Sequence, residues 1–425
     1  MKATFFMLLL GILPIASADQ ESWPQFRGPG GFGKSESRKI PTELNKDTLA
    51  WSVSLPGDGS SSPIIWGSRL FITSVDKEDE SVTLVCLDAI TGESKWTRSA
   101  KGGSPRMHRM NNPAAPTPVA TKDVVVLSWY DEARRKSILS GYSHEGAPTW
   151  EVEVGPHNSS HGPALQPSVH ENRILFANLH KSGGTVGALD AETGKMVWSR
   201  EYDQPASKNT YAAPFVRERL SDEGPRKEVV VASTGTGVIG LDFETGKDLW
   251  EMPGVFNHRC IISPFDLLSG SGLDDALIVA GCKNNTFFAL RPPDAAAGKD
   301  PEIAWRLTKA APYVPTPVSD GKTTFVLSDG GIIHALDSKS GEPRWVERLQ
   351  GNFYASPILA NGKLYCLTRE GEMIVAEVGE SFNLIASSSL KPADHIPFTD
   401  ATPAIAHDSL YVRVGDRLDC YRQGR

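Results

Sequence analysis

The sequence predicts an all-β fold, an eight-bladed β-propeller built from four-stranded antiparallel blades. Two recurring observations predict it. One is a turn element, Leu-Asp-x-x-Thr-Gly followed by Trp, and the other is a Pro that opens a short apolar strand and occurs eight times, 40 to 55 residues apart. That interval is typical of a propeller blade and suits a helical hairpin repeat poorly.

The turn element has four clear copies, which begin at Leu87, Leu189, Leu241 and Leu336. Weaker copies lead to Trp150 and Trp305, and a seventh, Ala376 to Ile385, lacks both the Asp and the Trp. The Asp side chain caps the turn, and the Gly takes the positive φ that other residues resist. We expect the Trp to pack between neighbouring blades, where its burial contributes about 2–3 kcal/mol.

The second mark is the strand-opening proline, at Pro63, Pro118, Pro167, Pro214, Pro264, Pro317, Pro357 and Pro403. Proline cannot donate to a β-ladder, but it is tolerated as the first residue of a strand or on an edge. The innermost strand of a blade is such an edge, because it faces the central channel. Each proline therefore marks the start of an inner strand.

The two ends of the chain predict how the ring closes. Leu49 to Val53 has a strand pattern containing Trp51 without a preceding turn, and Leu418 to Tyr421 ends the repeats without a Trp strand after it. We expect the N-terminal strand to complete the last blade, which removes two free sheet edges.

The sequence divides the chain into three segments. Residues 1–18 resemble a secretory signal peptide with cleavage after Ala18, and their apolar run is too short to span a bilayer. The protein is thus expected to be periplasmic or secreted, with no transmembrane segment. Residues 19–48 form an extended N-terminal arm, which we expect to lie across the side of the propeller, and residues 49–425 form the propeller.

Charge, cysteine usage and one motif limit the classes of function that the sequence allows. The chain has 44 basic and 51 acidic residues, a net charge of −7 that argues against a nucleic-acid surface. Its five cysteines are dispersed, which favours buried thiols and leaves a Cys260–Cys282 bridge open. Gly235 to Gly240 fits the dinucleotide pattern G-x-G-x-x-G, but a repeat turn follows it where that motif needs a helix.

The repeats resemble those of the PQQ-type β-propellers, the superfamily of quinoprotein alcohol dehydrogenases and of the non-catalytic outer-membrane assembly lipoprotein BamB. The resemblance covers residues 21–425, and the opening Trp23 to Gly33 is similar to exported PQQ-repeat proteins of planctomycete-like bacteria. It implies a scaffold or a redox enzyme. The dehydrogenases share a vicinal Cys-Cys disulfide, a stacking Trp and a calcium held by Glu, Asn and Asp. No two cysteines are adjacent here, so no cofactor is expected, and PQQ with calcium in particular is not.

The loops that lead into the inner strands, the mouth loops, share one face of a propeller and carry the candidate site residues. These are His108, Arg109, Asn112, His161, Tyr211, His258, Arg259, Tyr354 and His395. The arginines suit anions, the histidines can donate, accept or bind metal, and the tyrosines offer stacking faces. The alternative is that these loops are polar because a channel mouth is wet. No metal ligand set is predicted.

Three functions remain. The first is an exported, non-catalytic scaffold that binds protein or peptide partners through its rims. The second is small-ligand or glycan binding, or catalysis, at the channel mouth, and the third is PQQ-dependent oxidation. The sequence favours a protein without catalysis and leaves the question open.

Overall fold

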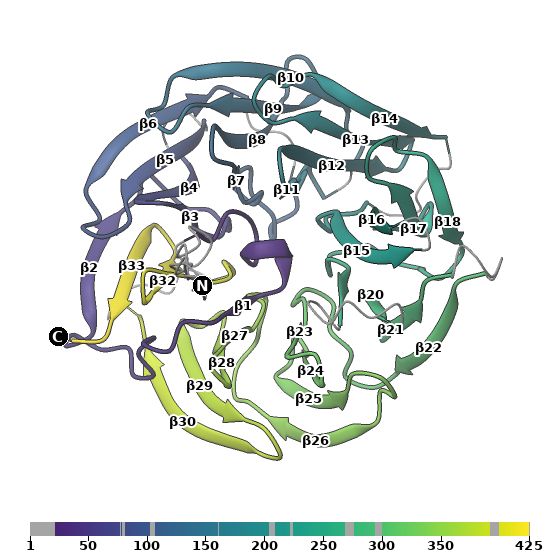
Figure 1. Ribbon diagram of the computed structural model, residues 1–425. Coiled ribbons are helices and arrows are strands. Elements are labelled where there is room, and N and C mark those ends of the chain that lie inside the picture. The colour runs from purple at the N-terminus through teal and green to yellow at the C-terminus, as the bar shows by residue number, and fades with distance from the viewer. Residues whose placement is uncertain are drawn as a thin grey trace, which may run out of the picture.

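A computed structural model describes residues 22–424 except 77, 79–80, 103–106, 160, 204–208, 222–223, 268–275, 294–299 and 392–398. Eight sheets surround a central channel (Figure 1), and each contains a four-stranded antiparallel blade, which confirms the predicted fold. The segment assigned to a signal peptide lies outside the described residues. Among those described, no helix has the length and apolar character needed to cross a membrane.

Blades 1 to 4 follow one another along the chain. Blade 1 contains β3 (Ile64–Trp66), β4 (Arg69–Val75), β5 (Val82–Asp88) and β6 (Ser94–Ala100). Blade 2 contains β7 (Val119–Ala120), β8 (Val125–Asp131), β9 (Lys136–Tyr142) and β10 (Pro148–Pro156). Blade 3 contains β11 (Ser168–His170), β12 (Arg173–His180), β13 (Gly183–Asp190) and β14 (Met196–Tyr202). Blade 4 contains β15 (Phe215–Ser221), β16 (Gly224–Ser233), β17 (Gly237–Asp242) and β18 (Asp248–Met252).

Blades 5 to 8 complete the ring. Blade 5 contains β19 (Phe265–Asp266), β20 (Ile278–Cys282), β21 (Thr286–Arg291) and β22 (Glu302–Leu307). Blade 6 contains β23 (Val318–Ser319), β24 (Thr323–Leu327), β25 (Ile332–Asp337) and β26 (Pro343–Arg348). Blade 7 contains β27 (Ile358–Ala360), β28 (Lys363–Leu367), β29 (Glu372–Val378) and β30 (Phe382–Ser389). Blade 8 contains β31 (Ala404–Ala406), β32 (Ser409–Val414) and β33 (Arg417–Arg422).

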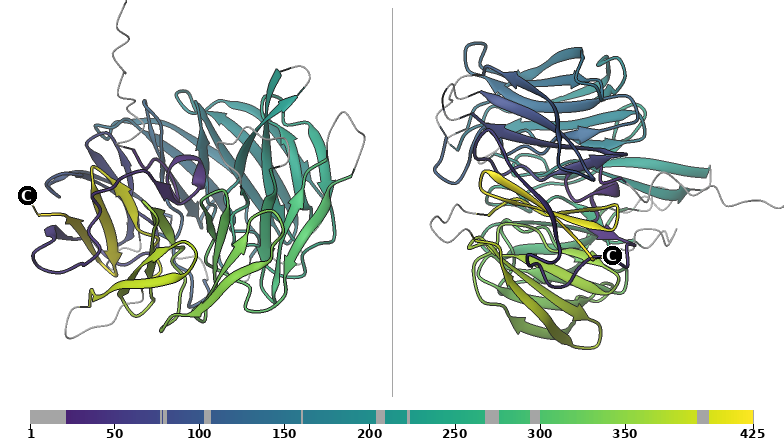
Figure 2. Two further views of the ribbon diagram at one scale, coloured as in Figure 1. Left: turned by 60° about the horizontal axis from the view of Figure 1, so that its bottom comes forward. Right: turned by 90° about the vertical axis from the view of Figure 1, so that its left-hand side faces the viewer.

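The fourth strand of blade 8 comes from the other end of the chain. Strand β2 (Leu49–Ser54) pairs antiparallel with β33, with Trp51 opposite Cys420. Figure 2 shows the yellow C-terminal strands beside the purple N-terminal segment. The predicted closure is confirmed.

Tryptophans on the outer strands join neighbouring blades, as predicted. Trp150 of blade 2 lies on Gly194 in the turn of blade 3, and its Nε1 donates to the Ala191 carbonyl at 2.9 Å. Gly194 has φ +68°, and a Cβ there would lie 2.6 Å from the Trp150 ring, so the contact requires glycine. Trp51 makes the same contact across the closure, on Gly92 and the Ala89 carbonyl.

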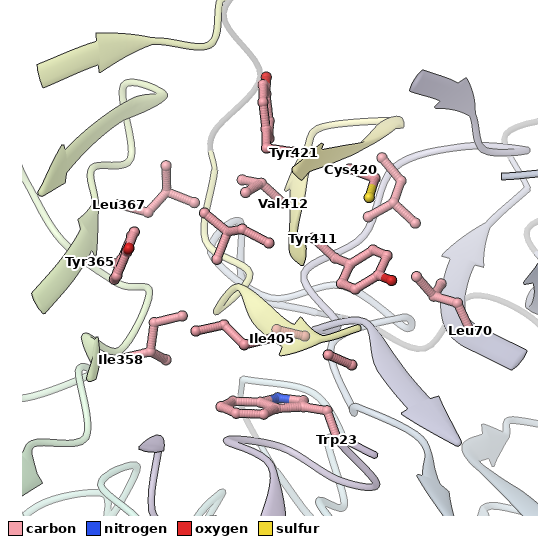
Figure 3. Close-up of a cluster of buried hydrophobic side chains, with 14 of the residues drawn as sticks. Trp23, Leu70, Ile358, Tyr365, Leu367, Ile405, Tyr411, Val412, Cys420 and Tyr421 are labelled. Carbon is pink, nitrogen blue, oxygen red and sulfur yellow. The ribbon is translucent and has the colours of Figure 1, made fainter. Parts of the chain in front are cut away.

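Blade 7 has no such tryptophan, and the closure explains why. Val375 pairs with Ala386 as Ala335 of blade 6 pairs with Trp345, so Ala386 occupies the tryptophan position. The next blade has no covalent turn between β33 and β2 for a tryptophan to cover. The arm takes that place: the Leu44 N–H donates to Ser388 Oγ at 3.0 Å, and Ile40 joins the core cluster of blades 7, 8 and 1. Figure 3 shows Tyr365, Ile405 and Leu70 of this cluster, one from each of these blades.

A belt of hydrogen bonds joins the blades at their inner edge. At all but one of the junctions, the residue before the strand-opening proline donates its backbone N–H to the side-chain oxygen of the equivalent residue in the next blade. The bonds, of 2.9 to 3.2 Å, run from Ser62 to Thr117, from Thr117 to Gln166, from Ala213 to Ser263, from Ser263 to Thr316, from Thr316 to Ser356, from Ser356 to Thr402 and from Thr402 back to Ser62. Seven of the eight junctions are thus joined; the junction into blade 4 lacks the bond because Ala213 has no side-chain oxygen.

Residues 23–35 of the arm lie in the channel, so for them the expectation that the arm crosses the side of the propeller is wrong. Residues 40–44 lie further out, beside blades 7 and 8. Trp23 forms a β-bridge with Ile65 of blade 1. The short 3-10 helix η2 (Pro29–Gly31) lies near the centre of the ring (Figure 1), and β1 (Lys34–Ser35) adds a parallel fifth strand to β27. The arm thereby contacts inner strands on several sides of the ring.

Arg27 anchors the arm in the channel. Its buried guanidinium donates to the Thr316 carbonyl at 2.7 Å, to the Pro317 carbonyl and, within the arm, to Gly31 and Phe32. Burial lowers its pKa to about 9. These acceptors are backbone carbonyls, which satisfy the buried donors without a carboxylate.

All five cysteines are buried free thiols, including Cys260 and Cys282. Gly235 to Gly240 forms the turn between β16 and β17 and then enters β17. Neither segment therefore provides a disulfide or a dinucleotide site.

The closure predicts a stability difference between two residues of one strand. Replacing half-buried Trp51 with Ala removes its contact with Gly92 and its bond to Ala89, and should lower the free energy of unfolding by roughly 2–3 kcal/mol. Leu49→Ala, at a side chain that is 37% exposed in the same strand, should cost much less. Urea unfolding followed by circular dichroism measures both, and equal losses would contradict the role of Trp51 in closure.

Candidate functional site

The mouth loops enclose a cavity of about 380 Å³ at the centre of the ring. Phe26 of the arm lines it together with residues of all eight blades. Each mouth loop runs inward to its proline, and Arg27 contacts Thr316 and Pro317 at the inner end of one of them. The arm therefore closes the cavity on the inner-strand side, and the mouth loops form its opposite rim.

Five of the nine predicted site residues line this cavity: His108, His161, Tyr211, Arg259 and Tyr354. Asn112 lies beside it and donates from Nδ2 to Ser60 Oγ at 2.7 Å, and the ring of His258 makes an edge contact with Tyr313. Arg109 is exposed on the same loop as His108. His395 lies outside the described residues. The structure thus brings most of the set together, while ligand binding by these residues stays a prediction.

The sequence reasoning missed several lining residues. Tyr313 lies four positions before Pro317, and Asp400 three positions before Pro403, so the mouth-loop rule could have found both. Lys283 could not be found in this way, because it lies in the hairpin between β20 and β21 and not in a mouth loop.

Tyr313 connects two cationic side chains of the cavity wall. Arg259 Nη1 donates to the Tyr313 hydroxyl at 3.2 Å, and Lys283 Nζ lies 5.3 Å from the centre of the Tyr313 ring. Burial raises the pKa of Tyr313 to about 12. The phenol therefore stays neutral and accepts from Arg259 at physiological pH.

The other side of the wall carries an ion pair. Arg369 donates to both carboxylate oxygens of Asp400, at 2.6 and 3.0 Å, and its guanidinium stacks 4.0 Å from the ring centre of Tyr354. The planar guanidinium suits both contacts at once. Asp400 is consequently neutralised by a fixed partner.

The two lining histidines pack on each other. The rings of His108 and His161 are stacked with their centres 4.6 Å apart. The His161 carbonyl accepts from the His108 N–H at 3.2 Å and from Asn111 Nδ2 at 3.0 Å, which ties two mouth loops together. Among the described residues, no group of three His, Cys, Asp or Glu could hold a metal ion.

His157 supports the loop that carries His161. Its Nδ1–H donates to Asn178 Oδ1 at 3.0 Å, and its Nε2 accepts from Asn209 Nδ2 at 3.1 Å. This pattern requires the neutral ring, because a protonated Nε2 could no longer accept. Burial lowers the pKa of His157 to about 4.

The lining residues do not fit PQQ with calcium. Asp400 is the one carboxylate among the described residues of the cavity wall, and Arg369 already holds it. No tryptophan is among those lining residues, and the cysteines are buried single thiols. The donor set that the quinoprotein resemblance implies is thus not assembled here.

Comparison with known proteins places the chain in a family. The family model described as outer membrane protein assembly factor BamB matches residues 135–262 and 294–381, about half of the chain. The chain belongs to this family. The BamB of Moranella endobia is 23% identical over 252 residues, 54% of this chain and 59% of that protein, and the BamB of Burkholderia pseudomallei is 27% identical over 198 residues, 44% and 45%. The chain therefore spans about half the length of these curated relatives.

Solved structures support the fold. The crystal structure of BamB from Moraxella catarrhalis superposes with a TM-score of 0.57 at 15% identity, covering 88% of this chain and 99% of that one. The computationally designed Ika8 protein gives 0.61 at 12% identity, covering 88% and 100%. A europium-containing methanol dehydrogenase gives 0.51 at 13%, covering 84% and 89%. A designed protein, an assembly factor and an enzyme share this fold, so it does not decide the function.

The His157 network predicts a pH dependence. Since its folded pKa is about 4 and the unfolded value is about 6.5, the unfolded chain binds more protons between these values, and stability falls as pH drops from 6.5 to 4. His157→Gln, which cannot take up a proton there, should remove on the order of 2 kcal/mol of this loss. Urea unfolding at pH 7 and pH 4.5 measures it, and identical pH profiles for both proteins would contradict the assignment.

Proposed function

We propose that the protein is an exported, non-catalytic scaffold that binds a protein partner along its rim at blades 7 and 8. The observation that carries this proposal is the absence of charge on two adjacent outer strands. Strands β30 and β2 contain no charged residue, whereas the other six outer strands each contain at least two. Charged residues on edge strands oppose pairing with another chain.

Exposed apolar side chains accompany this uncharged edge. Leu384 is 61% exposed and Ile385 is 41% exposed, both on β30, and Leu49 on β2 is 37% exposed. An edge strand with free backbone groups and apolar side chains suits an extended segment of a partner, which can add a strand to the sheet. The names of the curated relatives, outer membrane protein assembly factors, and the predicted signal peptide support a protein partner outside the cytoplasm.

Site-specific photo-crosslinking in cells tests the rim. A benzoylphenylalanine at Leu384 should give a discrete protein adduct, and Ile385→Lys should abolish it because a charge on the edge opposes strand addition. Met196 provides the matched position, since it is 43% exposed on the charged outer strand β14.

The control outcomes decide between a specific and a general surface. The crosslinker at Met196 should give no adduct, and Met196→Lys should leave the Leu384 adduct intact. Equal adducts from both positions, or an adduct that persists in the Ile385→Lys variant, would contradict the proposed rim site.

The same proposal excludes a redox cofactor. PQQ with calcium should leave the melting temperature unchanged, because the described residues of the cavity wall include no free set of carboxylates for the ion. Thermal unfolding with and without both components measures this. A rise in melting temperature that Arg259→Gln removes would favour the quinoprotein alternative.

A further inference from the structure

Two cations in the cavity wall make no ion pair among the residues that the structure describes. Neither Arg259 nor Lys283 forms an ion pair with a carboxylate in the described part of the chain, whereas Arg369 of the same cavity region pairs with Asp400. Arg259 Nε is moreover buried without a hydrogen-bond acceptor among the described residues. A buried donor of this kind costs free energy unless an acceptor is supplied.

The nearby carboxylates are already engaged. Asp400 is held by both nitrogens of Arg369. Asp329 Oδ2 accepts the backbone N–H of Tyr313 at 2.7 Å, and burial raises the pKa of its carboxyl. Asp329 also interacts with Lys283 through charge, so it offsets at most one of the two cations, and Arg259 and Lys283 still leave an excess of positive charge on this wall of the cavity.

The position of these cations is fixed by aromatic side chains. Arg259 bonds the Tyr313 hydroxyl, Lys283 lies over the Tyr313 ring, and the edge of His258 packs against the same ring. Tyr211 is held in turn, since its hydroxyl bonds the Gly162 carbonyl at 3.1 Å and Ser159 Oγ at 3.2 Å. Rigid neighbours reduce the entropy lost when an anion binds.

Beyond the cations the cavity wall carries a group of apolar side chains. These are Phe26, Ala115, Ala164, Ile261 and Val314, and Ile261 and Val314 follow Arg259 and Tyr313 inward along their mouth loops. The polar side chains that line the same end, Ser62, Thr117, Gln166, Ser356 and Thr402, already accept backbone N–H groups in the belt between the blades. The volume of about 380 Å³ lies within the range of small-ligand sites. The arm closes this end, so a ligand enters from the mouth.

We propose that the cavity binds a small organic acid, with its carboxylate between Arg259 and Lys283 and its apolar body towards Phe26, Ile261 and Val314. Guanidinium and ammonium groups form charge-assisted hydrogen bonds with a carboxylate. A sugar acid would set hydroxyl groups against the apolar wall, where they lose hydrogen bonds to water. Bare phosphate would leave the apolar part of the cavity unfilled. This site is independent of the proposed rim site.

Titration calorimetry with four probes tests the ligand class on the full mature chain. Benzoate carries both the charge and the apolar body, benzyl alcohol only the body, galacturonate the charge with a polar body, and inorganic phosphate the charge alone. We expect benzoate to bind at least about tenfold more tightly than each of the other three.

Variants of the two cations test the residues. Arg259→Gln and Lys283→Gln should each weaken benzoate binding by about tenfold or more while leaving the circular dichroism spectrum unchanged. Arg306→Gln is the matched control, because Arg306 is an exposed cation on outer strand β22 of the same blade and stacks on Phe288 away from the cavity. It should bind benzoate like the parent protein.

Three results would overturn the proposal. Benzyl alcohol binding as tightly as benzoate would show an apolar pocket that ignores charge. Phosphate binding as tightly would show a bare anion site. No binding of benzoate, 3-phenylpropionate or hexanoate at up to about 10 mM would show that organic acids are not ligands of the cavity. None of these results affects the crosslinking from β30, so the two proposals fail separately.

Discussion

Ring closure requires that each blade be held at both its inner and its outer edge, and two repeated contacts meet that requirement. At the inner edge, the backbone N–H of the residue before the proline donates to a side-chain oxygen of the next blade at seven of the eight junctions, as from Thr402 to Ser62 across the closure. At the outer edge, a tryptophan covers the turn glycine of the next blade, as Trp51 covers Gly92. The first contact satisfies buried backbone donors and the second buries apolar surface, so they resist different forms of opening.

The exceptions to these contacts occur where the covalent repeat changes. Blade 5 has an insertion in place of the regular turn, and Trp250 of blade 4 donates to Glu228 Oε2 at 3.2 Å instead of to a turn carbonyl. Glu228 is buried, and its Oε2 lies 3.4 Å from Nη1 of buried Arg217. Arg217 Nε lies 3.7 Å from Oδ2 of Asp266. A buried charged group of this kind is tolerated when its members satisfy one another, but losing one member leaves an uncompensated charge. Blade 7 is the second exception, because it faces the non-covalent junction between β33 and β2 in blade 8. There Ala386 takes the tryptophan position and the arm covers it.

The repeats made the blades, the closure and the docking role of tryptophan predictable. A turn with positive φ needs glycine and the start of an inner strand tolerates proline, so both structural features can be recognised in the sequence. The position of the arm was not predictable in the same way. Arg27 binds backbone carbonyls, and every residue has one, so no sequence pattern marks its partners. Lys283 was missed for a related reason: its hairpin has an ordinary turn sequence, and only the ring geometry brings it beside Tyr313. Arg259 and Tyr354 were found because the mouth loops depart from the repeat.

The contrast between residues that follow the repeat and residues that depart from it also matters for function. The residues that recur in the repeats serve to join blades, and a designed protein has the same fold, so the fold cannot by itself specify what is bound. Binding specificity must therefore come from positions that are not needed to join the blades. In this chain those places are the uncharged edge of blades 7 and 8 and the mouth loops around Arg259. Because the arm closes the channel beneath the mouth, a ligand in the cavity would have to leave through the mouth by which it entered.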